Sequence, residues 1–178
     1  PRVRRQRQMC IRDRDTIYTG AKFTRLYFKD CYIDGTTDFI FGPSTALFED
    51  CIIHSKRNSY VTAASTPKEA KYGYVFKHCK LTAEPGVDKV YLGRPWRPYA
   101  YTLFIECELG KHIVLAGWHN WGKQSNEETA RYMEYKNTGE GANASERVAW
   151  SKQLTKKEAE AVTVDAIFRT QSDWNPID

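Results

Sequence analysis

The feature that most constrains the fold is a six-residue phrase that occurs four times with little change. Each copy reads Phe-x-polar-Cys-x-aliphatic and has apolar residues at alternate positions, a pattern typical of a strand with one buried face. The cysteines are separated by 20, 28 and 28 residues, a spacing typical of solenoids and β-helices. The copies begin at Phe28, Phe48, Phe76 and Phe104, and their cysteines are Cys31, Cys51, Cys79 and Cys107.

A second set of short strand-like runs lies between these copies. The runs cover residues 38–41, 60–64, 90–94 and 112–116, and residues 15–19 take the same place upstream. No long amphipathic helix separates them, which argues against a βαβ sheet. The sequence therefore predicts an all-β chain folded as a parallel β-helix, with one coil per repeat and ladders of Phe, Cys and Ile in its core.

Two of the second runs carry a single charge between apolar residues and glycines, Asp38 in one and Arg94 in the other. A charge in such a place is costly unless it is paired or used. Stacked coils lie about 4.8 Å apart, so aligned runs would put Asp15 and Asp38 on neighbouring rungs and Arg94 two rungs beyond Asp38. The rung between carries Thr62, Ala63 and Ala64, which are small enough to let an arginine reach across. The repeat thus predicts two carboxylates and a guanidinium in one patch.

The net charge of +5 comes from the first 14 residues, and the remaining residues are balanced. A chain of 178 residues suffices for one domain, and no apolar run is long enough to span a membrane. We interpret residues 1–14 as a non-native segment, because residues 9–14 resemble translated sequencing-adaptor DNA. A nucleic-acid-binding arm is the alternative interpretation. On the first interpretation, the true N-terminus and any signal peptide are missing from this chain.

The repeated cysteines are best interpreted as a ladder of buried thiols that pack as small hydrophobes. No Cys-x-x-Cys or His-x-x-x-His spacing occurs, so we expect no zinc site. Residues 15–122 form the predicted β-helix domain. Residues 123–178 depart from the repeat and are predicted to form an irregular and helical cap over the last coil. Within them, residues 131–135 alternate like a strand, and Thr155 to Glu158 is a capping-box pattern that opens a short helix.

Residues 35–42 (GTTDFIFG) and 92–96 (LGRPW) resemble the signature segments of the pectin methylesterases, also called pectinesterases. Residues 15–18, 116–121 and 174–176 are similar to further segments of this family. The resemblance runs from about Asp15 to the C-terminus and indicates an N-terminally truncated, bacterial-type member. It implies a right-handed parallel β-helix that hydrolyses methyl esters on the galacturonate units of pectin without a cofactor.

The same resemblance implies the roles of individual residues. Asp38 matches the nucleophile that forms an acyl-enzyme, Asp15 the acid and base, and Arg94 the partner of the nucleophile. The aromatic residues that match the sugar groove are Phe41, Trp96 and Trp118. The division of labour agrees with electrostatics, because two neighbouring carboxylates cannot both ionise cheaply and an adjacent arginine keeps one of them charged.

Five of these residues also have a purely structural interpretation. Asp38 could be a turn residue, Asp15 a loop residue, Arg94 a structural ion pair, Phe41 a core residue, and Trp118 a contact for the C-terminal segment. The family carries a glutamine where this chain has Arg14, and a second glutamine expected upstream is absent. Because such side chains bind the developing oxyanion, their loss can lower turnover by roughly a hundredfold.

Three other functions stay open at this point: a pectate lyase, a polygalacturonase and a non-catalytic β-helix that binds polysaccharide. A lyase needs clustered carboxylates for calcium, and a polygalacturonase needs more aspartates in one patch. The expected partner is methyl-esterified pectin (homogalacturonan), with no nucleic acid and no membrane. The family implies an extracellular or periplasmic location, and the oligomeric state is left open.

Overall fold

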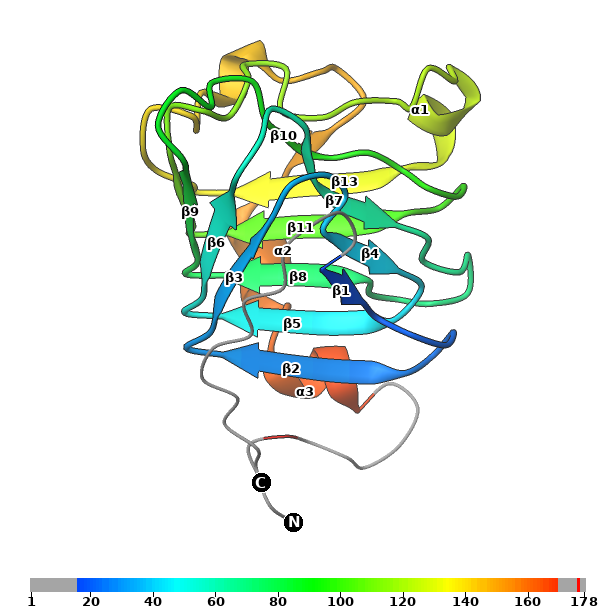
Figure 1. Ribbon diagram of the computed structural model, residues 1–178. Coiled ribbons are helices and arrows are strands. Elements are labelled where there is room, and N and C mark those ends of the chain that lie inside the picture. The colour runs from blue at the N-terminus through cyan, green and yellow to red at the C-terminus, as the bar shows by residue number, and fades with distance from the viewer. Residues whose placement is uncertain (1–15, 170–175, 177–178) are drawn as a thin grey trace.

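The computed structural model describes residues 16–169 and residue 176, and its strands form three parallel sheets wound into a β-helix (Figure 1). Sheet 1 has the order β1-β4-β7-β10, sheet 2 the order β14-β13-β11-β8-β5-β2, and sheet 3 the order β12-β9-β6-β3. Every pairing between these strands is parallel (for example β2 with β5 and β5 with β8). The all-β class and the parallel β-helix predicted from the repeat are confirmed.

The strands of each sheet come from successive coils. Those of sheet 1 are β1 (Ile17–Tyr18), β4 (Ile40–Gly42), β7 (Tyr60–Ala64) and β10 (Tyr91–Gly93). Those of sheet 2 are β2 (Arg25–Lys29), β5 (Thr45–Glu49), β8 (Tyr74–Lys77), β11 (Tyr101–Ile105), β13 (Arg131–Tyr135) and β14 (Lys152–Gln153). Those of sheet 3 are β3 (Tyr32–Gly35), β6 (Ile52–Ser55), β9 (Lys80–Ala83) and β12 (Glu108–Leu109).

The repeated phenylalanines form a stacked ladder along the inside of sheet 2. Ring centroids are 4.7 Å apart from Phe28 to Phe48, 4.5 Å from Phe48 to Phe76 and 4.4 Å from Phe76 to Phe104. The last three rings are fully buried. Burial of one such side chain stabilises the fold by about 1.5–3 kcal/mol, so the ladder ties each coil to the next.

The cysteines form a second ladder at the corner between sheets 2 and 3. Each buried thiol donates to the carbonyl of the phenylalanine one coil earlier, Cys51 to Phe28 at 3.5 Å and Cys79 to Phe48 at 3.4 Å. The hydrogen bond with the next thiol and then burial raise the pKa of the Cys51 thiol well above its ordinary value. The predicted structural role of the ladder therefore fits its chemistry, because a thiol without thiolate character is a poor nucleophile.

The C-terminal segment follows the prediction in part. The strand predicted at residues 131–135 is confirmed as β13, which pairs in parallel with β11, so sheet 2 continues beyond the predicted domain boundary at residue 122. The turns around η1 (Ala144–Glu146) cover the last coil, where Val148 and Trp150 pack against the core. The predicted run 112–116 forms no strand and contributes only the bridge from Val90 to Ile113.

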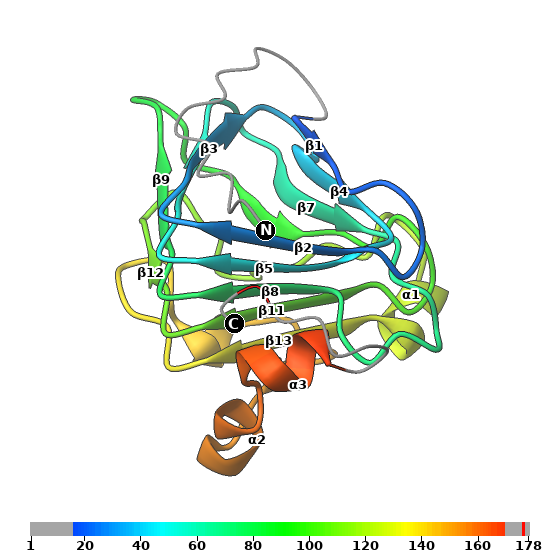
Figure 2. The same cartoon turned by 90° about the horizontal axis from the view of Figure 1, so that it is seen from below.

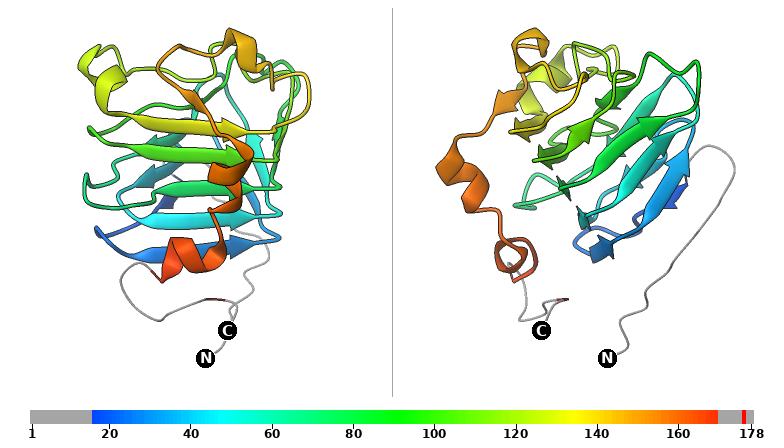
Figure 3. Two further views of the ribbon diagram at one scale, coloured as in Figure 1. Left: turned by 180° about the vertical axis from the view of Figure 1, so that it is seen from behind. Right: turned by 90° about the vertical axis from the view of Figure 1, so that its left-hand side faces the viewer.

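Helices α2 (Lys156–Glu160) and α3 (Val164–Phe168) run back along the outside of sheet 2, as the view from behind shows (Figure 3). The view from below shows α3 beside the outer face of the sheet (Figure 2). This differs from a cap over the last coil, because sheet 2 is apolar on its outer face as well. The outward Leu47, Val75 and Leu103 are fully buried in a cluster with Ile167 and Phe168.

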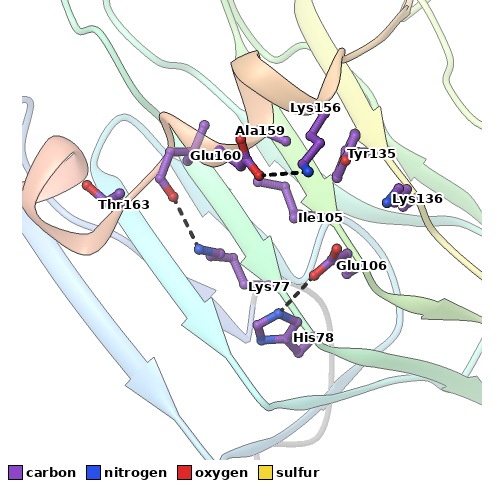
Figure 4. A pocket seen from close by; sticks show the side chains of 11 residues that line it. Lys77, His78, Ile105, Glu106, Tyr135, Lys136, Lys156, Ala159, Glu160 and Thr163 are labelled. Atoms are coloured by element: carbon purple, nitrogen blue, oxygen red, sulfur yellow. Dashed lines mark hydrogen bonds and ion pairs between the residues drawn. The ribbon is translucent and has the colours of Figure 1, made fainter.

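The predicted capping box is confirmed at the start of α2. The Thr155 side chain accepts from the Glu158 amide at 3.3 Å, and the Thr155 amide donates to the Glu158 carboxylate at 2.8 Å. Further along, Lys77 of β8 donates to the Val162 carbonyl at 3.2 Å (Figure 4). The remaining helix, α1 (Ser125–Thr129), precedes β13. None of the helices in the described part of the chain is long and apolar enough to cross a membrane.

Candidate active site on sheet 1

Asp38 and Arg94 meet on the outer face of sheet 1, as the rung assignment predicted. The guanidinium donates through Nε to Asp38 Oδ1 at 3.0 Å and through Nη2 to Asp38 Oδ2 at 2.6 Å. The two side chains are 13% and 20% exposed, so both charges face the surface of the site without being fully solvated. A bidentate pair of this kind fixes the plane of the carboxylate.

The backbone of sheet 1 sets the positions of both residues. Asp38 lies two residues before the start of β4 with φ +50°, in the left-handed region, and its amide donates to the Tyr60 carbonyl at 2.9 Å. Arg94 follows β10 directly, and its amide donates to the Thr62 carbonyl at 2.9 Å. Both residues are thus anchored to β7, the strand between them. The predicted rung of small residues is confirmed by this arrangement.

A glycine before the arginine is required by the close approach of β10 and β7. A Cβ at Gly93 would lie 2.1 Å from Thr62 Oγ1, and that hydroxyl is already committed to the Leu92 carbonyl at 2.9 Å. A side chain at this position would push the two strands apart. Since Arg94 is the next residue, the displacement would move the guanidinium away from Asp38.

Two aromatic rings hold the guanidinium of Arg94 between them. Its central carbon lies 3.9 Å from the ring centroid of Tyr60 and 3.8 Å from that of Trp121. Cation–π contacts of this length stabilise the cation and restrict the rotation of the side chain. The two rings therefore hold the guanidinium of Arg94 in an orientation in which its N–H groups point toward the Asp38 carboxylate.

The pair lines a cavity of about 330 Å³. Its walls are Thr37, Asp38, Phe41, Ala63, Arg94, Trp96 and Trp121. Phe41 and Trp96 lie 5.9 Å apart between ring centroids, and Trp96 is 36% exposed. The structure thus places the predicted groove residues Phe41 and Trp96 beside the charged pair. A carboxylate next to exposed aromatic faces suits a ligand with apolar ring faces and an electrophilic carbon.

Trp118 does not line this cavity, which corrects the prediction that it belongs to the groove. Its indole is 1% exposed and stacks on Tyr132 at 4.3 Å between ring centroids. The indole N–H donates to Glu134 Oε1 at 3.2 Å. The side chain points into the β-helix because Trp118 immediately follows a turn at Gly117, whose φ is +70°.

The sequence patterns assign no role in the site to Trp121, Tyr60 or Tyr18. Trp121 lines the cavity in place of Trp118, and Tyr60 is the second face of the arginine sandwich. Tyr18 is 59% exposed and lies 5.0 Å from Phe41 between ring centroids, which extends the row of aromatic residues along sheet 1. The alternation of strands could have identified Tyr60 and Tyr18, since both stand on the outward side of their runs.

Asp15 and Arg14 lie outside the described residues. Within the described part of the chain, no group of three or more His, Cys, Asp or Glu side chains could hold a metal ion. A second hollow, of about 240 Å³, lies between sheet 2 and α2 (Figure 4). Four of its polar side chains are paired with one another, His78 with Glu106 at 3.3 Å and Lys156 with Glu160 at 3.6 Å, and Lys77 donates to the Val162 carbonyl.

Comparison with known proteins identifies the family to which this chain belongs. The sequence model of the pectinesterase family matches residues 7–171. Pectinesterase 31 of Arabidopsis thaliana is 43% identical over 146 residues, which cover 82% of this chain and 45% of that protein. The chain therefore belongs to the pectinesterase family, and it spans about half the length of the curated relatives that it matches.

Solved structures show the same fold. A pectin methylesterase from carrot superposes with a TM-score of 0.81 at 34% identity, over 87% of this chain and 53% of that chain. A pectin methylesterase from Yersinia enterocolitica gives a TM-score of 0.74 at 29% identity, over 94% of this chain and 60% of that chain. Since relatives occur in plants and in bacteria, the bacterial-type assignment stays a prediction.

Proposed function

We propose that this chain carries the catalytic centre of a pectin methylesterase that hydrolyses galacturonate methyl esters of homogalacturonan. The observation that carries the proposal is the bidentate pair of Asp38 and Arg94 in the lining of a cavity that also holds aromatic side chains. A related pectin methylesterase, 28% identical to this chain over 91% of its length with a TM-score of 0.72, has been solved in complex with a hexasaccharide. That complex supports a sugar polymer as the ligand of this cavity.

In the proposed reaction, a carboxylate oxygen of Asp38 attacks the carbonyl carbon of the ester, and the bond from that carbon to the methoxy oxygen breaks. Asp15 in its acid form donates the proton with which the methoxide leaves as methanol. Asp15, now a carboxylate, takes a proton from water, whose oxygen attacks the acyl carbon. The free galacturonate is released and the Asp38 carboxylate is restored.

The role of Asp15 is supported by the sequence and by its neighbours. Ile17 of β1 stands opposite Ile40 of β4. Asp15 and Asp38 each stand two residues before one of these paired isoleucines. The family resemblance assigns the acid to the first aspartate and the nucleophile to the second.

The aromatic row has the chemistry of a sugar-binding surface. Trp96 and Phe41 would contact the apolar faces of the sugar rings on either side of the ester, and Trp121 would close the cavity next to Arg94. Because pectin is a polymer of the cell wall, an extracellular or periplasmic location follows from the proposed substrate.

The proposal is tested by methanol release from highly methylated pectin, with the purified chain and an Asp38→Asn variant. We expect release by the parent chain and a loss of about 10³-fold or more in the variant, because the amide cannot attack the ester. Newly cut or unsaturated chain ends from the parent would instead indicate a polygalacturonase or a lyase. Binding of pectin without methanol release, even after a longer N-terminal segment with Gln at position 14 is supplied, would indicate a non-catalytic binder.

A further inference from the structure

The turn that carries Trp121 into the active site is conformationally demanding. Trp121 has φ +63°, in the left-handed region that a bulky side chain rarely adopts. Its indole nevertheless lies 3.8 Å over the Arg94 guanidinium. Some interaction has to hold this backbone in place, because the position of the indole depends on it.

Two side chains of the same turn supply that interaction. The Trp121 amide donates to His119 Nδ1 at 3.0 Å, and the Gly122 amide donates to Asn120 Oδ1 at 2.8 Å. Asn120 is itself fixed by Glu127, whose carboxylate accepts from its side chain at 2.7 Å. The two bonds have the same form, from a side-chain acceptor to the amide two residues on. Only the His119 acceptor can be lost by protonation.

His119 is packed directly against the site. Its ring centroid lies 5.4 Å from that of Tyr60 and 5.3 Å from that of Tyr91, and its amide donates to the Gly93 carbonyl at 3.1 Å. Partial burial and then the nearby charge of Arg94 lower the pKa of His119 below 6.5. The neutral ring is the form that this environment favours.

We propose that His119 is a positioning residue whose neutral Nδ1 holds Trp121 against Arg94, and that protonation of His119 releases this contact at acid pH. Protonated Nδ1 carries a hydrogen and cannot accept from the Trp121 amide. It would also add a second cation beside Arg94. The groups that face His119 are Arg94, Tyr60 and Tyr91, while Asp38 and Glu127 each lie one contact further away.

The consequence for the site is a gate on the orientation of Arg94. With Trp121 displaced, the guanidinium keeps Tyr60 on one face only and gains freedom to leave the plane of the Asp38 carboxylate. The relevance of this gate to catalysis rests on the proposed function. The contact itself exists in the free protein, so it can be tested without substrate.

The test is a pH titration by ¹H–¹⁵N NMR of the unliganded chain, from about pH 7.5 to about pH 4.5. The reporters are the Trp121 amide and the Nε–H of Arg94. The Arg94 guanidinium lies between the Tyr60 and Trp121 rings, and its Nε–H donates a hydrogen bond to Asp38. In the parent chain, we expect both signals to move together with the His119 ring protons, at one midpoint below 6.5. The Arg94 signal should lose part of the ring-current shift that Trp121 causes.

Two variants separate this mechanism from simple packing. His119→Asn keeps an acceptor at the same number of bonds from Cα and cannot titrate, so the neutral-pH signals should be retained and the coupled shift lost. His119→Phe keeps a ring against Tyr60 and Tyr91 without the acceptor, so both signals should be displaced already at about pH 7.5. The proposal is wrong if the Arg94 and Trp121 signals titrate in the Asn variant as in the parent, or if the Phe variant matches the parent at neutral pH.

Methanol release over the same pH range provides a second measurement. We expect the parent chain to lose a larger share of its neutral-pH rate at about pH 5 than the Asn variant does. An equal fractional loss of rate in both proteins would contradict the proposed effect of His119 on catalysis. Absence of methanol release from the parent, with the expected NMR result, would count against the proposed function and leave the positioning role of His119 intact.

Discussion

Two arginine–carboxylate pairs lie at different places in this β-helix, and their surroundings differ sharply. Glu134 and Arg147 are each 3% exposed and close the last coil, whereas Asp38 and Arg94 are 13% and 20% exposed and open onto a cavity. Both pairs use the same chemistry. The two pairs differ in whether the carboxylate accepts further hydrogen bonds besides those from its arginine.

The closed pair is saturated with hydrogen bonds. Glu134 Oε1 accepts from Arg147 at 2.8 Å and Trp118 at 3.2 Å, and Oε2 accepts from Asn137 at 3.1 Å and Arg147 at 3.2 Å. Among the described residues, Asp38 accepts only from Arg94. A saturated carboxylate holds structure together, and a carboxylate with free lone pairs facing a cavity is available to a ligand.

The largest expected effect on stability separates the two pairs. Replacing Glu134 by Leu should lower the free energy of unfolding by about 3–5 kcal/mol, because Arg147 is left as a buried charge without its partner. Asp38→Asn should change it by no more than about 1 kcal/mol, since the partly exposed Arg94 remains solvated. Thermal unfolding followed by circular dichroism measures both. An equal loss of unfolding free energy in the two variants would contradict the distinction between a structural and a functional pair.

The next expected effect is on activity and uses lysine as a matched substitution. Arg94→Lys keeps the charge but loses the planar fork and most of the contact with the two rings, so methanol release should fall by about 100-fold. Arg147→Lys should lower the melting temperature and leave the rate per folded molecule close to that of the parent chain. A normal rate for the Arg94 variant would show that the bidentate geometry is not used in the reaction.

A smaller effect concerns how protonation of His112 changes the stability of the folded chain. His112 is 4% exposed, its Nε2 has no hydrogen-bond partner among the described residues, and burial followed by the charge of His54 lowers its pKa to about 4. The unfolded chain therefore binds this proton at a higher pH than the folded chain. The associated stability is complete above about pH 6.5 and is lost as the pH falls toward 4.

The size of this loss should be on the order of 2 kcal/mol. Urea unfolding of the parent chain and of His112→Gln at several pH values measures it. The variant should show a smaller fall in unfolding free energy between about pH 6.5 and about pH 4.5. Parallel curves would assign the acid sensitivity to other groups.

The smallest expected effect tests whether the C-terminal helices are independent of the active site. Thr155→Ala removes the capping box of α2 and should lower the unfolding free energy by about 1 kcal/mol. Methanol release per folded molecule should not change, because α2 lies on the outside of sheet 2 and the cavity is on sheet 1. A lowered rate would indicate coupling between the two sheets.

The sequence by itself determined the fold and the central pair of the site. The recurrence of the phrase beginning at Phe28 predicts parallel coils, because backbone hydrogen bonds between equivalent strands bring equivalent residues into register. Arg94 meets Asp38 across β7 for the same reason. Once the repeat is aligned, the order of rungs needs no further information.

Only the tertiary structure decided which tryptophan reaches the cavity and where the C-terminal helices lie. Trp118 turns inward and Trp121 outward because left-handed residues at Gly117 and Trp121 rotate the chain, and periodicity does not register such turns. The helices cover sheet 2 because Leu47 and its equivalents are apolar beside an apolar inner ladder. An alternation rule assumes one solvated face, so it cannot foresee a sheet that must be covered on both sides.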